Sequence, residues 1–240
     1  MAFLQSAPPR QPIFRAPPVV LWLIAGLALA HAARVMASPA ASLAVISEYA
    51  FVPARYSHAF MAAHMGQAGT LWDRALPFVS YMAVHNDFTH LTVNCLWLLA
   101  FGPTVARRFG ALLFMVFFIL CGVVGAATHL AFNWGSTMPV VGASGAISGL
   151  MAAAVRMLPQ ALPWAIPGEA PLAPIFSRPI LMFTAVWVAI NLLAGLTGLG
   201  SGGEGGLIAW QVHLGGFATG LLLCGSFDRL RPRGQGMPLE

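Results

Sequence analysis

Six long apolar runs alternate along the chain with shorter segments that hold most of its polar and charged residues. Each run has about 20 residues, the length that an α-helix needs to cross the hydrocarbon core of a bilayer. The runs cover residues 19–37, 81–101, 111–132, 140–158, 180–199 and 207–227. This pattern predicts an all-α polytopic membrane protein, folded as a bundle of six transmembrane helices.

The segments outside the runs predict a single membrane domain, residues 19–227, between two short terminal segments. Residues 1–18 contain several prolines and no hydrophobic periodicity, so we predict a disordered cytoplasmic leader there and a cytoplasmic tail at residues 228–240. Residues 38–80 form a long first outer loop, whose many aromatic side chains favour a position in the membrane interface. The glycine-rich stretch 201–206 is typical of a mobile cover.

The composition is that of a membrane protein rather than a soluble domain. Hydrophobic residues make up 58% of the chain and charged residues only 8%, with a mean hydropathy of +0.78. A soluble domain has about 25% charged residues. The net charge of +5 comes from arginines dispersed among the loops, so we predict no nucleic-acid partner. Cys95, Cys121 and Cys224 all lie inside apolar runs, which predicts packing roles and no disulfide.

The placement of the arginines predicts the orientation of the bundle. If the N-terminus is cytoplasmic, only Arg55 and Arg74 are outside and Arg34 lies at the outer edge. The cytoplasmic side then holds Arg10, Arg15, Arg107, Arg108, Arg156, Arg178, Arg229, Arg231 and Arg233. This asymmetry follows the positive-inside rule, so both termini are predicted to be cytoplasmic. All twelve basic residues are arginine, and alanine is abundant, which favours a protein of a bacterial inner (plasma) membrane.

A serine and a histidine in two of the runs predict a catalytic pair. Ser144 begins the small-residue pattern Ser-Gly-x-x-x-Gly that includes Gly145, and His213 is followed at i+3 and i+7 by Gly216 and Gly220. Small residues at these spacings let two membrane helices approach closely. Each residue alone is as compatible with a packing role, but together they predict a serine nucleophile activated by an imidazole. Apart from Asp87 near the start of the second run, no Asp or Glu lies within a run, so the sequence offers no carboxylate in the middle of a span to orient the ring.

His90 and Asn94 form a second group of polar residues, at i and i+4 on one helical face. Both side chains can donate hydrogen bonds, as acyl transfer requires where negative charge develops on the tetrahedral intermediate. With the main-chain N–H of Ser144, they are candidates for an oxyanion hole. A metal site is the alternative, but the His-Glu-x-x-His helix of membrane metalloproteases is absent, and we predict neither metal nor cofactor.

The chain resembles the rhomboid family of intramembrane serine proteases over residues 72–227. The resemblance rests on three motifs in family order: His85-x-x-x-x-His90-x-x-x-Asn94, Gly142-Ala143-Ser144-Gly145-Ala146 and His213-x-x-Gly216-x-x-x-Gly220. It implies a six-helix bundle that cleaves other membrane proteins in or near their spans. It also implies Ser144 as nucleophile, His213 as base, an oxyanion hole of His90, Asn94 and the Ser144 amide, and a supporting role for His85 and the motif glycine Gly142.

Two positions depart from the family pattern. Many members carry an aromatic residue four positions after the nucleophile, where it packs against the catalytic histidine, and this chain has Ser148. Another residue must therefore hold the imidazole of His213, or its orientation is looser. Trp72 and Arg74 resemble the tryptophan-arginine pair of the family's first outer loop, but Asp73 separates them.

These observations predict a serine endopeptidase that acts on transmembrane protein substrates, with its active site open to the outer face of the membrane. The competing prediction is a protein without catalytic activity. It would be either a rhomboid-like protein that binds client transmembrane segments or a small transporter, although we find no internal repeat of the kind common in transporters. The sequence leaves the identity of the substrate and the oligomeric state open.

Overall fold

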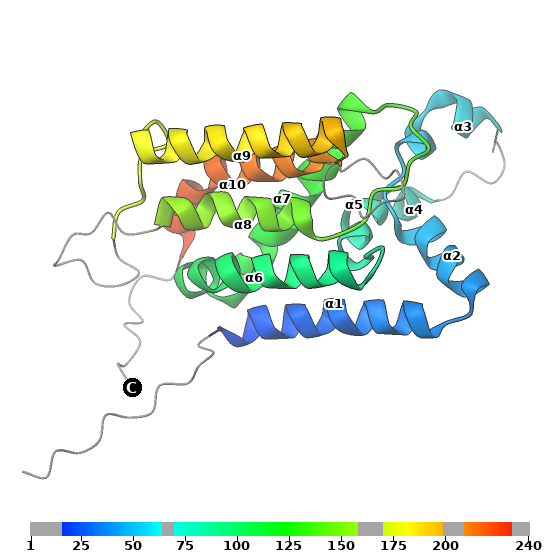
Figure 1. Cartoon of the computed structure of the whole chain (residues 1–240), viewed down its shortest axis with the longest axis horizontal. Coiled ribbons are helices and arrows are strands. Elements are labelled where there is room, and N and C mark those ends of the chain that lie inside the picture. Colours follow the sequence, from blue (N-terminus) through cyan, green and yellow to red (C-terminus); the bar gives the residue numbers. More distant parts are fainter. Residues whose placement is uncertain (1–15, 64–69, 158–169, 199–208, 232–240) are drawn as a thin grey trace, which may run out of the picture.

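A computed structural model describes residues 16–63, 70–157, 170–198 and 209–231, and all regular elements in these ranges are helices. Six of them are long: α1 (Pro18–Met36), α6 (Phe88–Phe109), α7 (Ala111–Phe132), α8 (Ser144–Met157), α9 (Arg178–Thr197) and α10 (Trp210–Leu230). They correspond to the six apolar runs and form an elongated bundle (Figure 1). Most of the predicted leader, the glycine-rich cover and most of the predicted tail lie outside the described residues.

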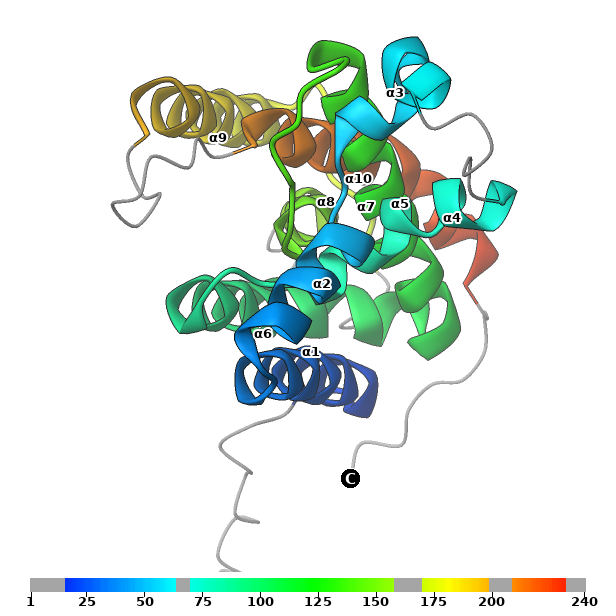
Figure 2. The ribbon, with the colours of Figure 1, turned by 90° about the vertical axis from the view of Figure 1, so that its right-hand side faces the viewer.

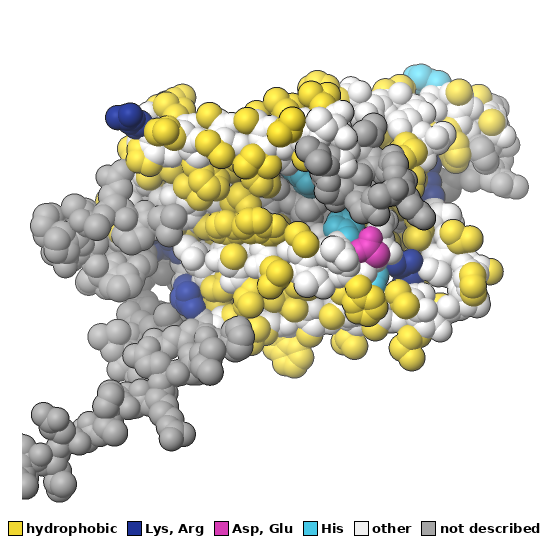
Figure 3. Space-filling model, in the orientation of Figure 1, with side chains coloured by type: hydrophobic (Ala, Val, Ile, Leu, Met, Phe, Trp, Pro, Cys, Tyr) yellow, Lys and Arg dark blue, Asp and Glu magenta, His cyan; other side chains and the backbone are white. Residues whose placement is uncertain are grey.

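Four of the described helices, α1, α6, α7 and α9, are long and apolar enough to cross a membrane. Hydrophobic side chains cover the middle of the bundle, and charged side chains gather toward its two ends (Figure 3). Helix α8 has 14 residues, which at about 1.5 Å per residue is shorter than the hydrocarbon core. Helix α10 is long, but polar residues such as Gln211, His213 and Asp228 lower its apolar character.

The second and fourth apolar runs begin as helices later than we predicted. Helix α6 starts at Phe88 rather than at residue 81, because the Asp87 side chain accepts a hydrogen bond from the His90 amide and caps the helix there. Helix α8 starts at Ser144 rather than at residue 140, because Val140 pairs with Phe51 in an isolated β-bridge. His90 and Ser144 therefore both lie in the first turn of their helices.

Helix α8 is the centre of the bundle. It packs against α6, α7 and α10, while α1 lies outside α6 and α9 packs chiefly on α10 (Figure 2). Of its 14 residues 12 are buried, including the polar Ser148 and Arg156. A short, small-residue helix is thus enclosed by longer ones, and its first residue faces the same end of the bundle as the starts of α6 and α10.

Glycines set the close approach of α8 and α10. A Cβ atom added at Gly216 would meet the main-chain oxygen of Gly145, and one added at Gly220 would meet the main chain of Gly149. Main-chain atoms cannot move aside as a flexible side chain can, so side chains at these positions would push the two helices apart. The small-xxx-small pattern places the backbones in contact.

The segment between α1 and α6 folds into short helices at one end of the bundle (Figure 1). They are α2 (Pro39–Tyr49), η1 (Pro53–Tyr56), α3 (His58–Ala63), α4 (Leu71–Ala75), α5 (Pro77–Ser80) and η2 (Tyr81–Ala83). Phe51 is fully buried between the rings of Tyr56 and Phe78, which anchors this segment to the bundle. Trp72 lies on α4 and is 67% exposed.

Two buried arginines stabilise the opposite end. Arg108 of α6 forms a bidentate ion pair with Asp228 of α10, with N–O distances of 2.6 and 2.9 Å, and donates a third bond to the carbonyl of Ala170. Arg156 of α8 donates to the carbonyls of Ala173 and Leu221 at 3.1 and 2.7 Å. These arginines join three long helices to the segment that precedes α9.

Candidate active site

Ser144 and His213 are in direct contact. Ser144 is the first residue of α8 and His213 lies in the first turn of α10. The Nε2 atom of His213 is 2.7 Å from Oγ of Ser144, a hydrogen-bond distance. The two atoms meet because the glycine faces of α8 and α10 bring the starts of these helices together. The geometry is that of a hydroxyl whose proton an imidazole can accept.

Asn191 of α9 contacts the other ring nitrogen of His213, at 2.8 Å from its Oδ1 to Nδ1. Asn191 is buried, and its Nδ2 donates to the carbonyl of Trp187 at 2.9 Å. Asn191 belongs to none of the motifs that predicted the site. The available signal was a single amide in the middle of a run of apolar residues, a placement that marks functional residues in membrane helices.

His90 lies next to Gly142, directly before the start of α8. A Cβ atom on Gly142 would overlap the edge of the His90 ring, at 2.6 Å from Nε2. Gly142 also has φ of +107°, a conformation that other residues rarely adopt, and its N–H donates to the carbonyl of Tyr81. Both observations explain a glycine here, since the ring can then reach the turn that carries Ser144.

Asn94 is buried one turn after His90 on α6, and its Nδ2 donates to the main-chain carbonyl of His90 at 2.8 Å. One of its two amide hydrogens is therefore used within its own helix, and the other is available. The Oδ1 atom of Asn94 has no hydrogen-bond partner among the described residues. Asn94 is thus buried one turn from His90, with one amide hydrogen and its Oδ1 available for further bonds.

Main-chain amides at the start of α8 are a second source of hydrogen-bond donors. The first bond of the helix runs from the N–H of Ile147 to the carbonyl of Ala143. The amides of Ser144, Gly145 and Ala146 precede that bond, so the helix itself supplies them with no acceptor. The positive end of the helix dipole also lies here, which favours negative charge next to Oγ of Ser144.

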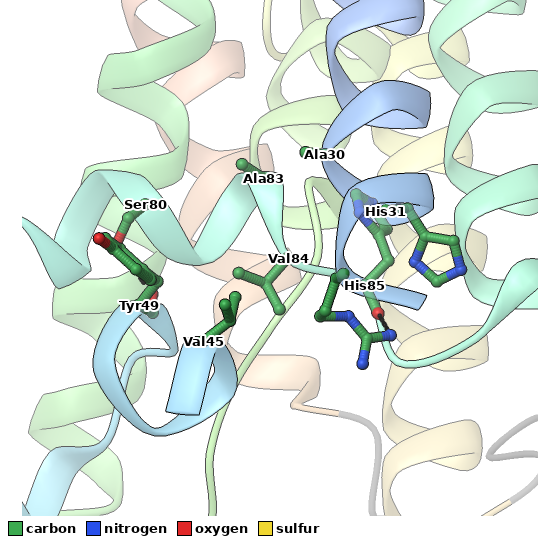
Figure 4. Close-up of a pocket in the computed structure, with 9 residues that line it drawn as sticks. Ala30, His31, Val45, Tyr49, Ser80, Ala83, Val84 and His85 are labelled. Atoms are coloured by element: carbon green, nitrogen blue, oxygen red, sulfur yellow. Dashed lines mark hydrogen bonds between the residues drawn. The ribbon is translucent and has the colours of Figure 1, made fainter. Parts of the chain in front are cut away.

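His85 lies behind His90, with ring centroids 5.2 Å apart in an edge-to-face arrangement. It is fully buried, and burial lowers its pKa to about 4, so the ring is neutral at physiological pH. Arg34 of α1 donates to the carbonyls of His85 and Asn86, both at 2.7 Å, and fixes this turn. His85 also lines a cavity of about 190 Å³ next to His31 of α1 (Figure 4).

Ser148 is one turn after Ser144, and its Oγ donates to the Ser144 carbonyl at 2.7 Å. This is a local bond within α8, common for serine in helices. Ser148 therefore satisfies its own hydroxyl on the helix backbone, and the hydrogen-bond partner of Nδ1 of His213 is Oδ1 of Asn191 instead.

Among the described residues, no three His, Cys, Asp or Glu side chains gather as potential metal ligands. The polar groups around Ser144 are instead hydroxyl, imidazole and amide groups, carried by α6, α8, α9 and α10. This set of groups suits proton transfer and hydrogen-bond donation.

Comparison with known proteins agrees with this arrangement. Residues 68–227, about two thirds of the chain, match the family profile described as the Rhomboid domain. A search of curated proteins finds no match. The match spans the four helices that carry Ser144, His213, Asn191 and His90. The chain therefore belongs to the rhomboid family, and its apolar helices make it a multi-pass membrane protein.

Proposed function

We propose that this protein is a serine endopeptidase that cleaves transmembrane protein substrates in or near their membrane spans. The observation that carries the proposal is the 2.7 Å contact between Oγ of Ser144 and Nε2 of His213. A serine hydroxyl is a weak nucleophile until a base accepts its proton, and an imidazole at this distance is such a base. Membership of the rhomboid family supports the same reading.

The proposed reaction passes through an acyl-enzyme. His213 takes the proton of Ser144 while Oγ attacks the carbonyl carbon of the scissile peptide bond, and the proton then passes to the leaving amine. Water attacks the resulting ester with His213 again as base, which regenerates Ser144. Each step moves one proton between named atoms, and the reaction needs no cofactor.

The tetrahedral intermediate carries a negative oxygen that requires hydrogen-bond donors. We assign this role to the main-chain N–H of Ser144, to His90 and to the free amide hydrogen of Asn94. The amide precedes the first helical bond of α8, and His90 adjoins the turn at Gly142. None of the three needs a positive charge in order to donate, and a site within a membrane holds a neutral donor at lower cost than a cation.

We further propose that six helices span the membrane, that both termini are cytoplasmic and that the site opens to the outer face. The placement of the arginines supports this orientation. Water can then reach the acyl-enzyme from outside. A substrate helix must unwind locally to expose its carbonyl, so spans with glycine or proline near the cleavage site are expected to be preferred.

Covalent labelling tests the proposal against an inactive rhomboid-like protein that only binds client segments. Purified full-length protein in detergent is treated with a fluorophosphonate probe, and the modified residue is located by mass spectrometry. We expect labelling at Ser144 in the wild type and none in His213→Ala. Ser148→Ala is the matched control and should label like the wild type, because its hydroxyl bonds only to the helix backbone. Absence of labelling, or equal labelling in His213→Ala, would support the inactive alternative.

A further inference from the structure

The imidazole of His213 is held from the side opposite to Ser144 by a residue that belongs to none of the three motifs. Its Nδ1 lies 2.8 Å from Oδ1 of Asn191, and Asn191 is only 4% exposed. We propose that Asn191 is a positioning residue that fixes both the orientation and the tautomer of His213. The proposal rests on the proposed function, because it concerns how the base is prepared for Ser144.

The carbonyl of Trp187 determines which way the Asn191 amide points. The Nδ2 atom of Asn191 donates to this carbonyl at 2.9 Å. In the flipped orientation two oxygens would face each other, so the hydrogen-bond network selects the observed one. Oδ1 is then the atom that faces His213, and an amide oxygen only accepts hydrogen bonds.

The tautomer of His213 follows from this orientation. Because Oδ1 of Asn191 only accepts, Nδ1 of the imidazole must carry the hydrogen in the 2.8 Å contact. The neutral ring has one hydrogen, so Nε2 is left with its lone pair toward Oγ of Ser144, at 2.7 Å. This is the only neutral tautomer that can take the serine proton.

The contact between α9 and α10 keeps these groups in register. Trp187 and Asn191 are one turn apart on α9, and His213 and Phe217 are one turn apart on α10. The Trp187 ring stacks on Phe217 with ring centroids 6.0 Å apart, and Asn191 meets His213 one turn away. Asn191 is one of only three buried residues of α9, so the amide lies in the contact and not in the lipid-facing surface.

A neutral partner suits this site. In soluble triads a carboxylate orients the histidine, but no Asp or Glu lies in the described part of α9 or in the first turn of α10. An ionised carboxylate within a membrane helix is costly, whereas an amide accepts the same hydrogen bond without charge. Asn191 thus supplies the orientation that Ser148, bonded to the Ser144 carbonyl, does not supply.

The experiment compares three variants in full-length protein, with cleavage of a transmembrane substrate in detergent as the assay. Asn191→Leu keeps the size but removes the acceptor, and kcat should fall about 10-fold or more with KM nearly unchanged. Asn191→Asp keeps an acceptor oxygen whether or not it is protonated, and it should recover most of that loss. Thr184→Val is the control for removing a polar group from the same helix, and it should leave kcat unchanged.

A spectroscopic readout separates positioning from general damage. In wild-type protein with ¹⁵N-labelled histidine, the neutral ring of His213 should carry its hydrogen on Nδ1, and in Asn191→Leu the two tautomers should mix. A wild-type ring protonated on Nε2 would overturn the proposal without any variant. Equal kcat in Asn191→Leu and wild type, or an Asn191→Asp variant as slow as Asn191→Leu, would also overturn it.

These outcomes are distinct from failure of the proposed function. If the wild type shows no turnover that depends on Ser144 and His213, the protease proposal itself is wrong. If Asn191→Leu is slow but still labels at Ser144 only when His213 is present, the protease proposal stands and the role of Asn191 is supported.

Discussion

The two ends of the bundle bury polar groups in opposite ways. At the serine end, defined by Ser144, His213, Asn191, His90 and Asn94, the side chains are amides, a hydroxyl and imidazoles, and Oδ1 of Asn94 has no partner among the described residues. At the arginine end, defined by Arg108, Arg156 and Asp228, charged groups are held by ion pairs and main-chain carbonyls. At the arginine end the polar groups are paired within the protein, whereas the serine end has an open acceptor on Asn94 and unpaired amides at the start of α8, as the proposed binding of a substrate requires.

Buried polar atoms without a hydrogen-bond partner distinguish the two ends. Nearly all buried polar atoms in proteins have partners, so atoms without one need an explanation. The Oδ1 atom of Asn94 at the serine end lacks one among the described residues, as do both ring nitrogens of His85, which packs against His90. Oγ of Ser177, just before α9, also lacks one, but no atom of Arg108 or Arg156 does. The bonds of Arg108 and Arg156 go instead to Asp228 and to main-chain carbonyls. Substitutions at the two ends should therefore differ in kind.

The largest effect is expected at the arginine end and on stability. Arg108→Met removes the bidentate pair with Asp228 and the bond to Ala170, and the free energy of unfolding should fall by about 3 kcal/mol. This is the lower end of the usual cost, because Arg231 still faces the same carboxylate. Equilibrium unfolding in mixed micelles measures this change in the free energy of unfolding. The exposed neighbour Arg107→Met should cost less than about 1 kcal/mol, and an equal loss in both would remove the distinction.

The next effect concerns the glycine contact that brings the dyad together. In Gly216→Val the new side chain meets the main-chain oxygen of Gly145, so α8 and α10 must separate. A displacement of about 1 Å at a catalytic pair costs about 100-fold in turnover. Gly225→Val on the same helix is the control, because nothing lies within 4 Å of its Cβ position. Normal cleavage by Gly216→Val would show that the contact is not needed for catalysis.

Asn94→Ala tests the proposed oxyanion donor at the serine end. Loss of one such donor typically lowers kcat about 100-fold, and stability should change little because Asn94 bonds only to its own helix. Steady-state cleavage and thermal unfolding of the same preparation distinguish the two effects. A variant that is destabilised but keeps its kcat would assign Asn94 a purely structural role.

The serine end should also respond to pH. Burial lowers the pKa of His85 to about 4 from an ordinary value of 6.5, so the unfolded chain binds more protons between these values. The contribution of neutral, buried His85 to the free energy of unfolding is fully present above pH 6.5 and is lost as the pH falls toward 4. Between pH 7 and pH 5 the loss should be about 2 kcal/mol. In His85→Gln the free energy of unfolding should fall less over this pH range, even though the nearby His90 and Arg34 remain. If it falls with pH as steeply as in the wild type, His85 is not the cause.

The smallest effect is expected for Ser148→Ala. The hydroxyl of Ser148 bonds only to the Ser144 carbonyl within α8, so kcat should change by less than about 2-fold. A loss comparable to that of Asn191→Leu would mean that Ser148 takes part in holding His213, and Asn191 would then not be its only support.

The sequence was sufficient to predict the long helices and the family. The rhomboid family is confirmed by the match over residues 68–227, and hydrophobic runs mark the helices because a membrane imposes the length of its spans. The short helices between α1 and α6 were not predicted, because they are held by long-range contacts such as Phe51 with Phe78 rather than by a periodic pattern.

Some residues of the candidate site were predicted from the sequence and Asn191 was not, for a physical reason. Ser144, His213 and His90 stand in motifs that keep fixed spacing along the chain, so their pattern is visible in the sequence. Asn191 meets His213 through one contact between α9 and α10, and the spacing of 22 residues between them follows no helical period. The start of α8 was placed too early because the β-bridge to Phe51 competes with helix formation at Val140.

Cleavage of a reconstituted transmembrane substrate is the most direct test of the protease proposal. Wild-type protein and Ser144→Ala are placed in proteoliposomes with a substrate whose span contains a glycine or proline. We predict a defined cleavage product with the wild type and none with Ser144→Ala, while both proteins unfold at the same temperature. Equal product from both, or a wild type that binds the substrate without cutting it, would contradict the assignment of Ser144 as nucleophile.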